Sequence, residues 1–295
     1  MTSRVAVPAV LRATMTAAHG PAGAAWCDRL PALVAGFARR WGVPVGEPFD
    51  APWHWVGTAG DGAVLKVGYP SAERDIAREA AVLRTWGGVG AVRVLAADTG
   101  GDDAEAILLE RVRPGTDLLR LPDREVFPLL GAVGRALHAC GAARPGRARE
   151  PGDLAGLRAG HPLLPRETTG RAAELVEHLI ATSVEPVLCH GDLHHGNVLV
   201  GRGGPVAIDP RGVWGEPALD VGVALLNPLG TLPEDRAQLR ALLEQRLELI
   251  CPAMGVDVDR GRSWTAVSAA VSAVWSAQDG GGVDRAGLAV FDVLS

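Results

Sequence analysis

One block of sequence constrains this chain more than any other feature. It is C-H-G-D-L-H-H-G-N-V-L-V at residues 189–200, and V-A-I-D-P follows at 206–210. Because apolar runs flank both segments, we expect Asp192 and Asn197 on a loop between two short strands and Asp209 at the end of another strand. Carboxylate and amide oxygens on adjacent loops are the hard ligands that Mg²⁺ prefers. The block therefore predicts a divalent-cation site.

The spacing of these residues also predicts a reaction. D-x-x-x-x-N followed by a later Asp matches the catalytic loop and the second metal ligand of protein kinases. We expect Asp192 to orient an attacking hydroxyl and take its proton, and Asn197 and Asp209 to hold Mg²⁺ against the phosphates of ATP. A lone H-G-D is more often a simple turn, and the two further residues at kinase spacing favour the catalytic interpretation.

Lys66, the only lysine of the chain, lies in the expected strand 63–68. An Asp-Gly turn at 60–62 joins this strand to an expected strand at 53–57. A helix is expected at 71–86 with Ser71 as its N-cap. Its Glu79 is the expected partner of Lys66, as in the lysine–glutamate pair of kinases that positions the α- and β-phosphates. Glu73 is the rival partner, and a surface lysine that snorkels from its strand is the alternative.

The remaining pattern predicts an α+β chain with a boundary near residue 112. Strands at 91–97 and 105–111 complete a small mixed β-sheet in a unit spanning 1–112, and residues 113–295 form a larger, mostly helical unit. Helices are expected at 22–41, 123–143, 167–182, 234–250 and 262–278, a loop at 144–165, and short strands and turns within 186–222.

Composition bounds the partners and the compartment. The net charge is −5 and no basic stripe occurs, which disfavours nucleic acid. No apolar stretch approaches the ~20 residues that span a membrane, and the apolar run at 5–11 is too short for a secretory signal. The four cysteines form no C-x-x-C pair, so we expect reduced thiols in a cytoplasmic protein. The oligomeric state has no sequence signal.

Several motifs together resemble the aminoglycoside phosphotransferase family. H-G-D-L-H-x-x-N with I-D-P is similar to that family rather than to eukaryotic protein kinases, and the G-x-G-x-x-G loop of protein kinases is missing. From about residue 50 to 225, successive segments resemble, in the same order, the streptomycin 6-phosphotransferase and hydroxyurea phosphotransferase branch of this family. The matching segments are L-K-V at 65–67, R-E-A-A-V-L-R at 78–84, G-A-V-R-V-L at 90–95, L-L-E-R-V-R-P-G-T-D-L at 108–118 and A-I-D-P-R-G-V-W-G-E-P-A-L-D-V at 207–221.

This resemblance implies a protein-kinase-like fold of two lobes that uses ATP. It implies that Glu110, Arg111 and Val112 form the hinge, with Glu110 and Val112 contacting the adenine. It also implies that Asp220 and His190 brace the catalytic loop. Arg211 stands where many relatives carry Lys. It is either a phosphate contact or one partner of a surface ion pair. His194 and His195 receive no role, and the strand and loop near 49–58 are the candidate cover for the phosphates.

The implied acceptor is a cationic aminocyclitol antibiotic, streptomycin first, phosphorylated at its 6-hydroxyl with resistance as the result. Its guanidinium groups predict carboxylates in the acceptor pocket, and the candidates are Asp153, Glu216, Asp279 and Asp284. A kinase of another small hydroxylated metabolite or of hydroxyurea is the alternative. A nucleotide-binding pseudokinase is a further alternative, although the expected base, metal ligands and lysine are all present.

Overall fold

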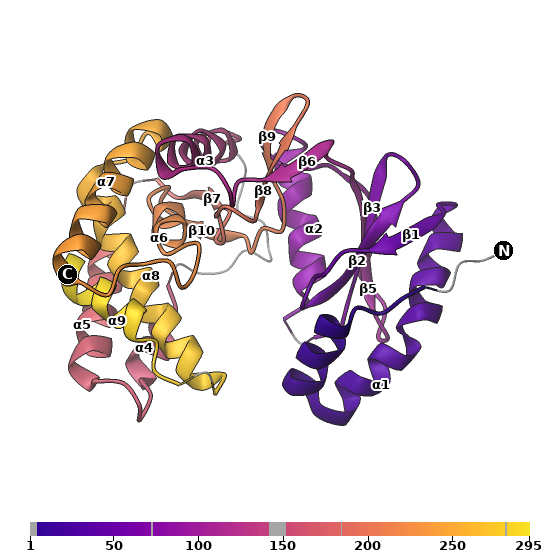
Figure 1. Cartoon of the computed structure of the whole chain (residues 1–295), viewed down its shortest axis with the longest axis horizontal. Helices are drawn as coiled ribbons and strands as arrows, with labels where there is room; N and C mark the ends of the chain where they lie inside the picture. Colours follow the sequence, from indigo (N-terminus) through magenta and orange to yellow (C-terminus); the bar gives the residue numbers. More distant parts are fainter. Residues whose placement is uncertain (1–4, 72, 142–151, 184, 281) are drawn as a thin grey trace. The chain divides into compact units, whose positions relative to one another are not determined.

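The chain forms two compact units, Met1–Arg113 and Pro114–Ser295 (Figure 1). The computed structural model describes residues 5–71, 73–141, 152–183, 185–280 and 282–295. The division lies one residue beyond the boundary expected from sequence. Residues 144–151 of the expected loop lie outside the described residues, and part of the remainder forms helix α4 (Leu154–Ala159) instead.

The N-terminal unit is built on a five-stranded sheet in the order β1-β2-β3-β5-β4, with every pairing antiparallel. Residues 60–62 join β2 and β3, as the Asp-Gly turn predicts. β1 has no counterpart among the strands expected from the sequence, and it ends at Pro48. It lies at the sheet edge, where a proline without an N–H removes no ladder hydrogen bond. The strands are β1 (Val45–Pro48), β2 (His54–Ala59), β3 (Ala63–Gly68), β4 (Val94–Asp98) and β5 (Glu105–Glu110).

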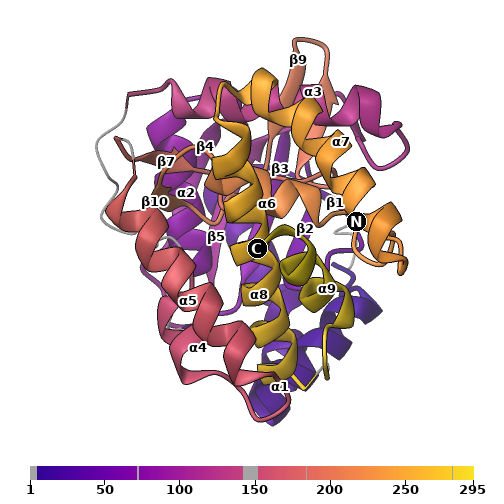
Figure 2. The ribbon, with the colours of Figure 1, turned by 90° about the vertical axis from the view of Figure 1, so that its left-hand side faces the viewer.

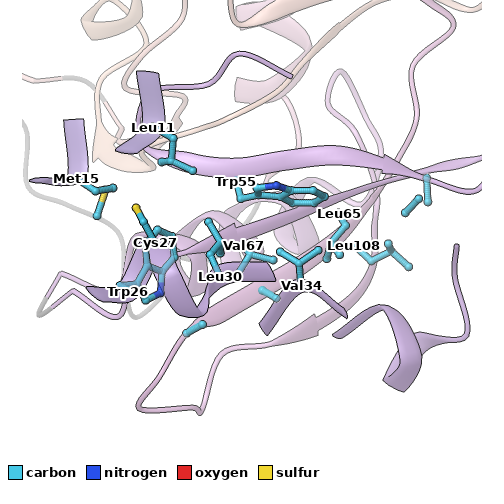
Figure 3. Close-up of a cluster of buried hydrophobic side chains, with 14 residues drawn as sticks. Leu11, Met15, Trp26, Cys27, Leu30, Val34, Trp55, Leu65, Val67 and Leu108 are labelled. Carbon is cyan, nitrogen blue, oxygen red and sulfur yellow. The ribbon is translucent and has the colours of Figure 1, made fainter. Parts of the chain in front are cut away.

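Helix α1 (Ala9–Trp41) covers one face of this sheet (Figure 3). Its Trp26, Leu30 and Val34 are fully buried with Trp55 of β2 and Leu65 of β3. The helix begins earlier than the expected residue 22. It is interrupted at residue 20, a glycine with φ 56° that only a residue without Cβ adopts easily.

Helix α2 (Asp75–Trp86) packs on the opposite face of the sheet. Side chains alternate along a strand, so Leu65 and Val67 face α1 while Lys66 between them faces α2. The alternation therefore turns the one lysine of the chain toward Glu79.

The expected N-cap of α2 was wrong. The helix begins at Asp75, and Ser71 Oγ accepts a hydrogen bond from the Arg74 N–H in the turn before it. The Ala77 N–H in the first helical turn instead donates to the buried Glu105 carboxylate of β5, at 3.1 Å. A carboxylate at a helix N-terminus satisfies an open donor and complements the helix dipole. The cap is thus supplied by a distant strand.

The C-terminal unit is mostly helical (Figure 2). Helix α8 is its centre and contacts α4, α5, α6, α7 and α9. Among the described residues, no helix combines the length and apolar character that a membrane crossing requires. The other helices are α3 (Asp123–His138), α5 (Arg166–Ala181), α6 (Leu219–Leu225), α7 (Arg236–Met254), α8 (Val258–Gln278) and α9 (Arg285–Leu294).

Two small antiparallel sheets carry the loops of this unit. One has the order β6-β8-β9 and the other pairs β10 with β7. The loop between β7 and β8 holds residues 190–197, and Asp209 follows β9. The strands are β6 (Pro114–Asp117), β7 (Val187–Cys189), β8 (Val198–Gly201), β9 (Gly204–Ala207) and β10 (Val213–Gly215).

Candidate active site

The loop after β7 is fixed from behind by Asp220, which is fully buried at the start of α6. Its two carboxylate oxygens accept hydrogen bonds from the N–H groups of His190, at 2.9 Å, and Gly191, at 2.8 Å. His138 Nε2 adds a third contact at 2.9 Å. A buried carboxylate needs such donors, so the expected bracing role of Asp220 is confirmed by its contacts.

His190 braces the same loop from within. Its Nε2 lies 3.0 Å from the Ile208 carbonyl oxygen, and its Nδ1 lies 3.2 Å from the Asp192 backbone nitrogen. An imidazole protonated at Nε2 satisfies both contacts, donating to the carbonyl and accepting from the N–H. This ring ties the segment before Asp209 to the backbone of Asp192, as expected.

The three residues expected to share a cation site lie together. Asn197 Nδ2 donates to the Asp192 carbonyl oxygen at 2.9 Å, and the Ile208 N–H donates to the Asn197 carbonyl oxygen at 2.9 Å. Asp209 follows Ile208 directly and is exposed. Because the Asn197 NH₂ group is committed to the loop, its amide oxygen is the atom left to act as a ligand. An amide oxygen and a carboxylate form a hard donor set that fits Mg²⁺.

Two basic side chains flank the Asp192 carboxylate. Arg211 Nε lies 3.2 Å from Asp192 Oδ2, and His194 Nε2 lies 3.9 Å from Oδ1. Burial lowers the pKa of His194, although the charges of Asp192 and Asp209 oppose that shift. The His194 imidazole thus lies within electrostatic range of both carboxylates.

His195 is a packing residue. It is buried, and its ring meets Phe127 of α3 edge to face at a centroid distance of 5.5 Å. Burial lowers its pKa to about 4, helped by the charge of Arg246. The ring is therefore neutral at physiological pH.

In the N-terminal unit, Lys66 and Glu79 form an ion pair. Lys66 Nζ lies 2.7 Å from Glu79 Oε2, and both side chains are buried. The rival Glu73 is mostly exposed and lies 3.8 Å from Arg78 instead. The structure thus selects Glu79 over Glu73 as the partner of Lys66.

The expected hinge is partly engaged in local contacts. The Glu110 carboxylate accepts from the Arg93 backbone N–H at 3.0 Å and from Arg93 Nε at 2.9 Å. The Arg111 N–H donates to the Gly62 carbonyl oxygen at 2.9 Å. These bonds fix the end of β5, and Val112 follows it directly; adenine contacts by Glu110 and Val112 stay a prediction.

A cavity of about 620 Å³ in the C-terminal unit adjoins the catalytic loop, with Asp192, His194 and Arg211 in its lining. Of the four carboxylates expected there, Asp153 lines it. Glu216 is buried and binds Arg260 through both oxygens, at 3.0 and 2.5 Å.

The other two expected carboxylates also have different positions. Asp284 caps α9 by accepting from the Gly287 N–H, and Asp279 ends α8. Neither is among the described residues that line the cavity. Asp153 is thus the one of the four candidates in the described lining of this cavity, whereas Glu216 and Asp284 serve internal partners and Asp279 lies at a helix end.

Sequence reasoning missed the aromatic lining of this cavity. Trp264 and Trp275 of α8 both line it, and Arg211 lies over the Trp275 ring at 5.5 Å. The sequence shows both tryptophans within the expected helix 262–278, but the exposure of Trp275 on this largely buried helix is visible only in the structure. Such a residue has no local pattern that separates a binding role from packing.

Comparisons with known proteins agree with this geometry. Residues 52–280 match the family described as aminoglycoside/hydroxyurea antibiotic resistance kinase. A hydroxyurea phosphotransferase of Kitasatospora aureofaciens is 33% identical over 94% of this chain and 82% of its own. A streptomycin 6-kinase of Streptomyces glaucescens is 30% identical over 94% of this chain and 92% of its own.

A solved structure supports the fold. A thermostable mutant of an aminoglycoside phosphotransferase, in a ternary complex with ADP and hygromycin B, superposes with a TM-score of 0.62. It is 15% identical, and the match covers 88% of this chain and 97% of that one. The fold is thus protein-kinase-like. The chain belongs to the aminoglycoside/hydroxyurea antibiotic resistance kinases and is a phosphotransferase.

Proposed function

We propose that this protein transfers the γ-phosphoryl group of ATP to a hydroxyl of a small molecule, with Asp192 as the catalytic base. The observation that carries the proposal is the joint fixation of the catalytic loop. Asp220 holds two of its backbone N–H groups, and Asn197 holds the Asp192 carbonyl oxygen. A preorganised carboxylate beside an acceptor cavity suits general-base catalysis.

The chemical step follows from these positions. The acceptor oxygen bonds to the γ-phosphorus while the bond to the β–γ bridging oxygen breaks, and ADP leaves. The proton of the acceptor hydroxyl passes to the Asp192 carboxylate, which lines the cavity. Asn197 and Asp209 would hold Mg²⁺, which neutralises charge on the phosphates when bound.

The N-terminal unit supplies the proposed nucleotide contacts. Lys66, held by Glu79 at 2.7 Å, would bind the α- and β-phosphates. Glu110 and Val112 would contact the adenine through their backbone. The segment of residues 49–53 joins β1 and β2 ahead of the lysine strand. We assign it the covering of the phosphates, the task of the glycine-rich loop that the sequence lacks.

Two acceptor classes follow from the relatives. Streptomycin, phosphorylated at its 6-hydroxyl, is the acceptor suggested by the relative that is named streptomycin 6-kinase. Another small hydroxylated compound is the second, since another relative is named for hydroxyurea. The apolar lining of the cavity also favours the second class.

The test is ADP release by the full chain with ATP, Mg²⁺ and a panel containing streptomycin and hydroxyurea, with products identified by mass spectrometry. Asp192→Asn should lower kcat by about 10²- to 10⁴-fold and leave ATP affinity nearly unchanged. Asp279→Asn, which alters an exposed carboxylate of the same unit, is the matched control. Full turnover by Asp192→Asn would show that Asp192 is not the base. Nucleotide binding by the unaltered chain without turnover of any acceptor would favour a pseudokinase.

Resistance is a separate readout. A sensitive bacterial host that expresses the chain should gain tolerance to streptomycin if streptomycin is the acceptor. The Asp192→Asn chain, expressed at the same level, should give none. Equal tolerance with both chains would point to sequestration of the drug rather than to phosphorylation.

A further inference from the structure

The cavity beside Asp192 has walls that are mostly apolar. Helix α6 contributes Leu219 and Val223, helix α8 contributes Val267 and Val271, and the segment after α6 contributes Leu229. The two tryptophans of α8 add aromatic surface to the same cavity. Apolar area of this kind stabilises a ligand by removing apolar ligand surface from water.

The cavity offers few negative charges. Among the described lining residues, the carboxylates are Asp153 and Asp192. Asp153 Oδ1 accepts from the Gly156 N–H at 2.9 Å, and its Oδ2 accepts from Trp275 Nε1 at 2.9 Å. Asp192 Oδ2 lies 3.2 Å from Arg211 Nε. Both acids thus already have donors, so a cationic ligand would have to displace or share them.

Arg211 adds a permanent positive charge to the same lining. Its guanidinium lies over the Trp275 ring at 5.5 Å while its Nε faces Asp192. A second cation close to Arg211 would be repelled, and the apolar walls offer it no counterion. Burying an unpaired charge is strongly unfavourable.

Neighbouring acids are committed elsewhere. Glu216, just before α6, binds Arg260 and the Trp264 indole N–H. Asp284 caps α9 and accepts from Ser272 Oγ at 3.3 Å. Redirecting either carboxylate toward the cavity would break an existing hydrogen bond, which carries its own cost.

From these four observations we propose that the acceptor is an uncharged alcohol with an apolar, ring-containing body, and that polycationic aminoglycosides are poor acceptors. This inference rests on the proposed phosphoryl transfer for the role of the hydroxyl. The apolar lining and Trp275 hold the body of the acceptor, and its hydroxyl lies toward Asp192. The recognition chemistry is burial of apolar area with few charge pairs.

Direct binding tests the preference without turnover. Calorimetric titrations use the full chain with a non-hydrolysable ATP analogue and Mg²⁺, and the ligands are 2-(2-naphthyl)ethanol, chloramphenicol and streptomycin. The two neutral aromatic alcohols should bind at least about tenfold more tightly than streptomycin, the range that a few apolar contacts supply. Equal or tighter binding of streptomycin, or no binding of either neutral alcohol, overturns the proposal.

Two variants locate the preference. Trp275 is 38% exposed, so Trp275→Ala should fold, and it should weaken binding of the neutral alcohols by about tenfold. Leu229 is 74% exposed, so Leu229→Asp adds a carboxylate to the lining and should tighten streptomycin binding while weakening the neutral alcohols. Ile180→Ala removes an exposed apolar side chain of the same unit outside the lining and should change neither. Unchanged binding in both lining variants contradicts the assignment of this cavity.

Turnover separates this inference from the proposed function. If ADP release depends on Asp192 but is faster with streptomycin than with every neutral alcohol, the proposed preference for neutral acceptors is wrong and the proposed phosphoryl transfer stands. If neutral alcohols bind tightly but no hydroxyl compound gives Asp192-dependent ADP release, the proposed phosphoryl transfer is wrong and the binding preference stands.

Discussion

Lys66 and Glu79 lie in contact, with 2.7 Å between Nζ and Oε2, although their side chains are only 5% and 4% exposed. Two charges removed from water are stable together because each compensates the other. Removing one partner leaves a buried charge without its counterion, which typically costs about 3–5 kcal/mol. We expect Glu79→Ala to lower the free energy of unfolding by that amount in urea titrations monitored by circular dichroism.

The double variant Lys66→Met/Glu79→Leu separates stability from nucleotide binding. It replaces the pair by apolar side chains of similar volume, so its stability should equal that of wild type or exceed it by about 1–4 kcal/mol. Its KM for ATP should nevertheless rise, since the ammonium group is lost. A double variant with wild-type ATP kinetics would show that the pair is purely structural.

Asp220 gives a pH-dependent prediction. Burial alone would raise its pKa, but the hydrogen bond and charge of His138, the charge of His190 and the Gly191 N–H lower it on balance. A carboxyl whose native pKa is depressed stabilises the fold above its unfolded value of about 3.9, and that stabilisation is lost as the pH falls through the lower native pKa. Wild-type stability should therefore fall below about pH 4.

Asp220→Asn isolates this effect. The variant should be less stable at pH 7 by roughly 1.5–3 kcal/mol, the range for a hydrogen bond to a charged group. Its stability should also fall less steeply below about pH 4 than that of wild type. Chemical unfolding at pH 7, 5, 4 and 3 measures both, and parallel curves for the two proteins would contradict the titration of Asp220.

The sequence predicted those features whose signals are local. The turn at 60–62 and the start of the helix expected at 123–143 are correct, since α3 begins at Asp123. The catalytic loop was also placed between its strands correctly. Each of these features depends on a few neighbouring residues whose pattern favours one backbone conformation.

Features created by distant contacts were not predictable in this way. Glu105 caps α2 from 28 residues away, so Ser71 was mistaken for the cap. Glu216 binds Arg260, 44 residues further along the chain, and is absent from the described lining of the cavity. A single sequence shows that a carboxylate exists but not which partner tertiary packing brings to it.

The Arg246 side chain of α7 connects three elements of the C-terminal unit. It is 4% exposed, its Nε lies 2.8 Å from Asp123 Oδ2 and its Nη1 lies 2.8 Å from the Leu225 carbonyl oxygen. Its guanidinium also lies 5.0 Å from the centroid of Phe127. One side chain thus joins α3, the end of α6 and α7.

Arg246→Ala should lower the free energy of unfolding by about 3–5 kcal/mol, because Asp123 loses its partner and a carbonyl oxygen loses its donor. Arg246→Lys should rescue little, since an ammonium group cannot reproduce the planar fork. The control is Arg240→Ala, an exposed arginine of the same helix, which should shift stability by less than about 0.5 kcal/mol. Full rescue by lysine would reduce the role of Arg246 to its charge.

The four cysteines give a prediction about reactivity. Cys27, Cys189 and Cys251 are fully buried, whereas Cys140 at the end of α3 is half-buried. Burial raises the pKa of all four thiols, that of Cys251 to about 12. Because the thiolate is the reactive form and must also be accessible, Cys140 should be the fastest to react.

Titration with a chromogenic disulfide reagent at pH 8 measures this. Native protein should release one equivalent quickly, and unfolding in guanidinium should release the other three. Cys140→Ser should abolish the fast equivalent, while Cys251→Ser should preserve it and lower only the total after unfolding. A fast phase that survives Cys140→Ser would mean that one of the buried thiols becomes exposed by local opening before global unfolding, since none of the three is accessible in the folded chain.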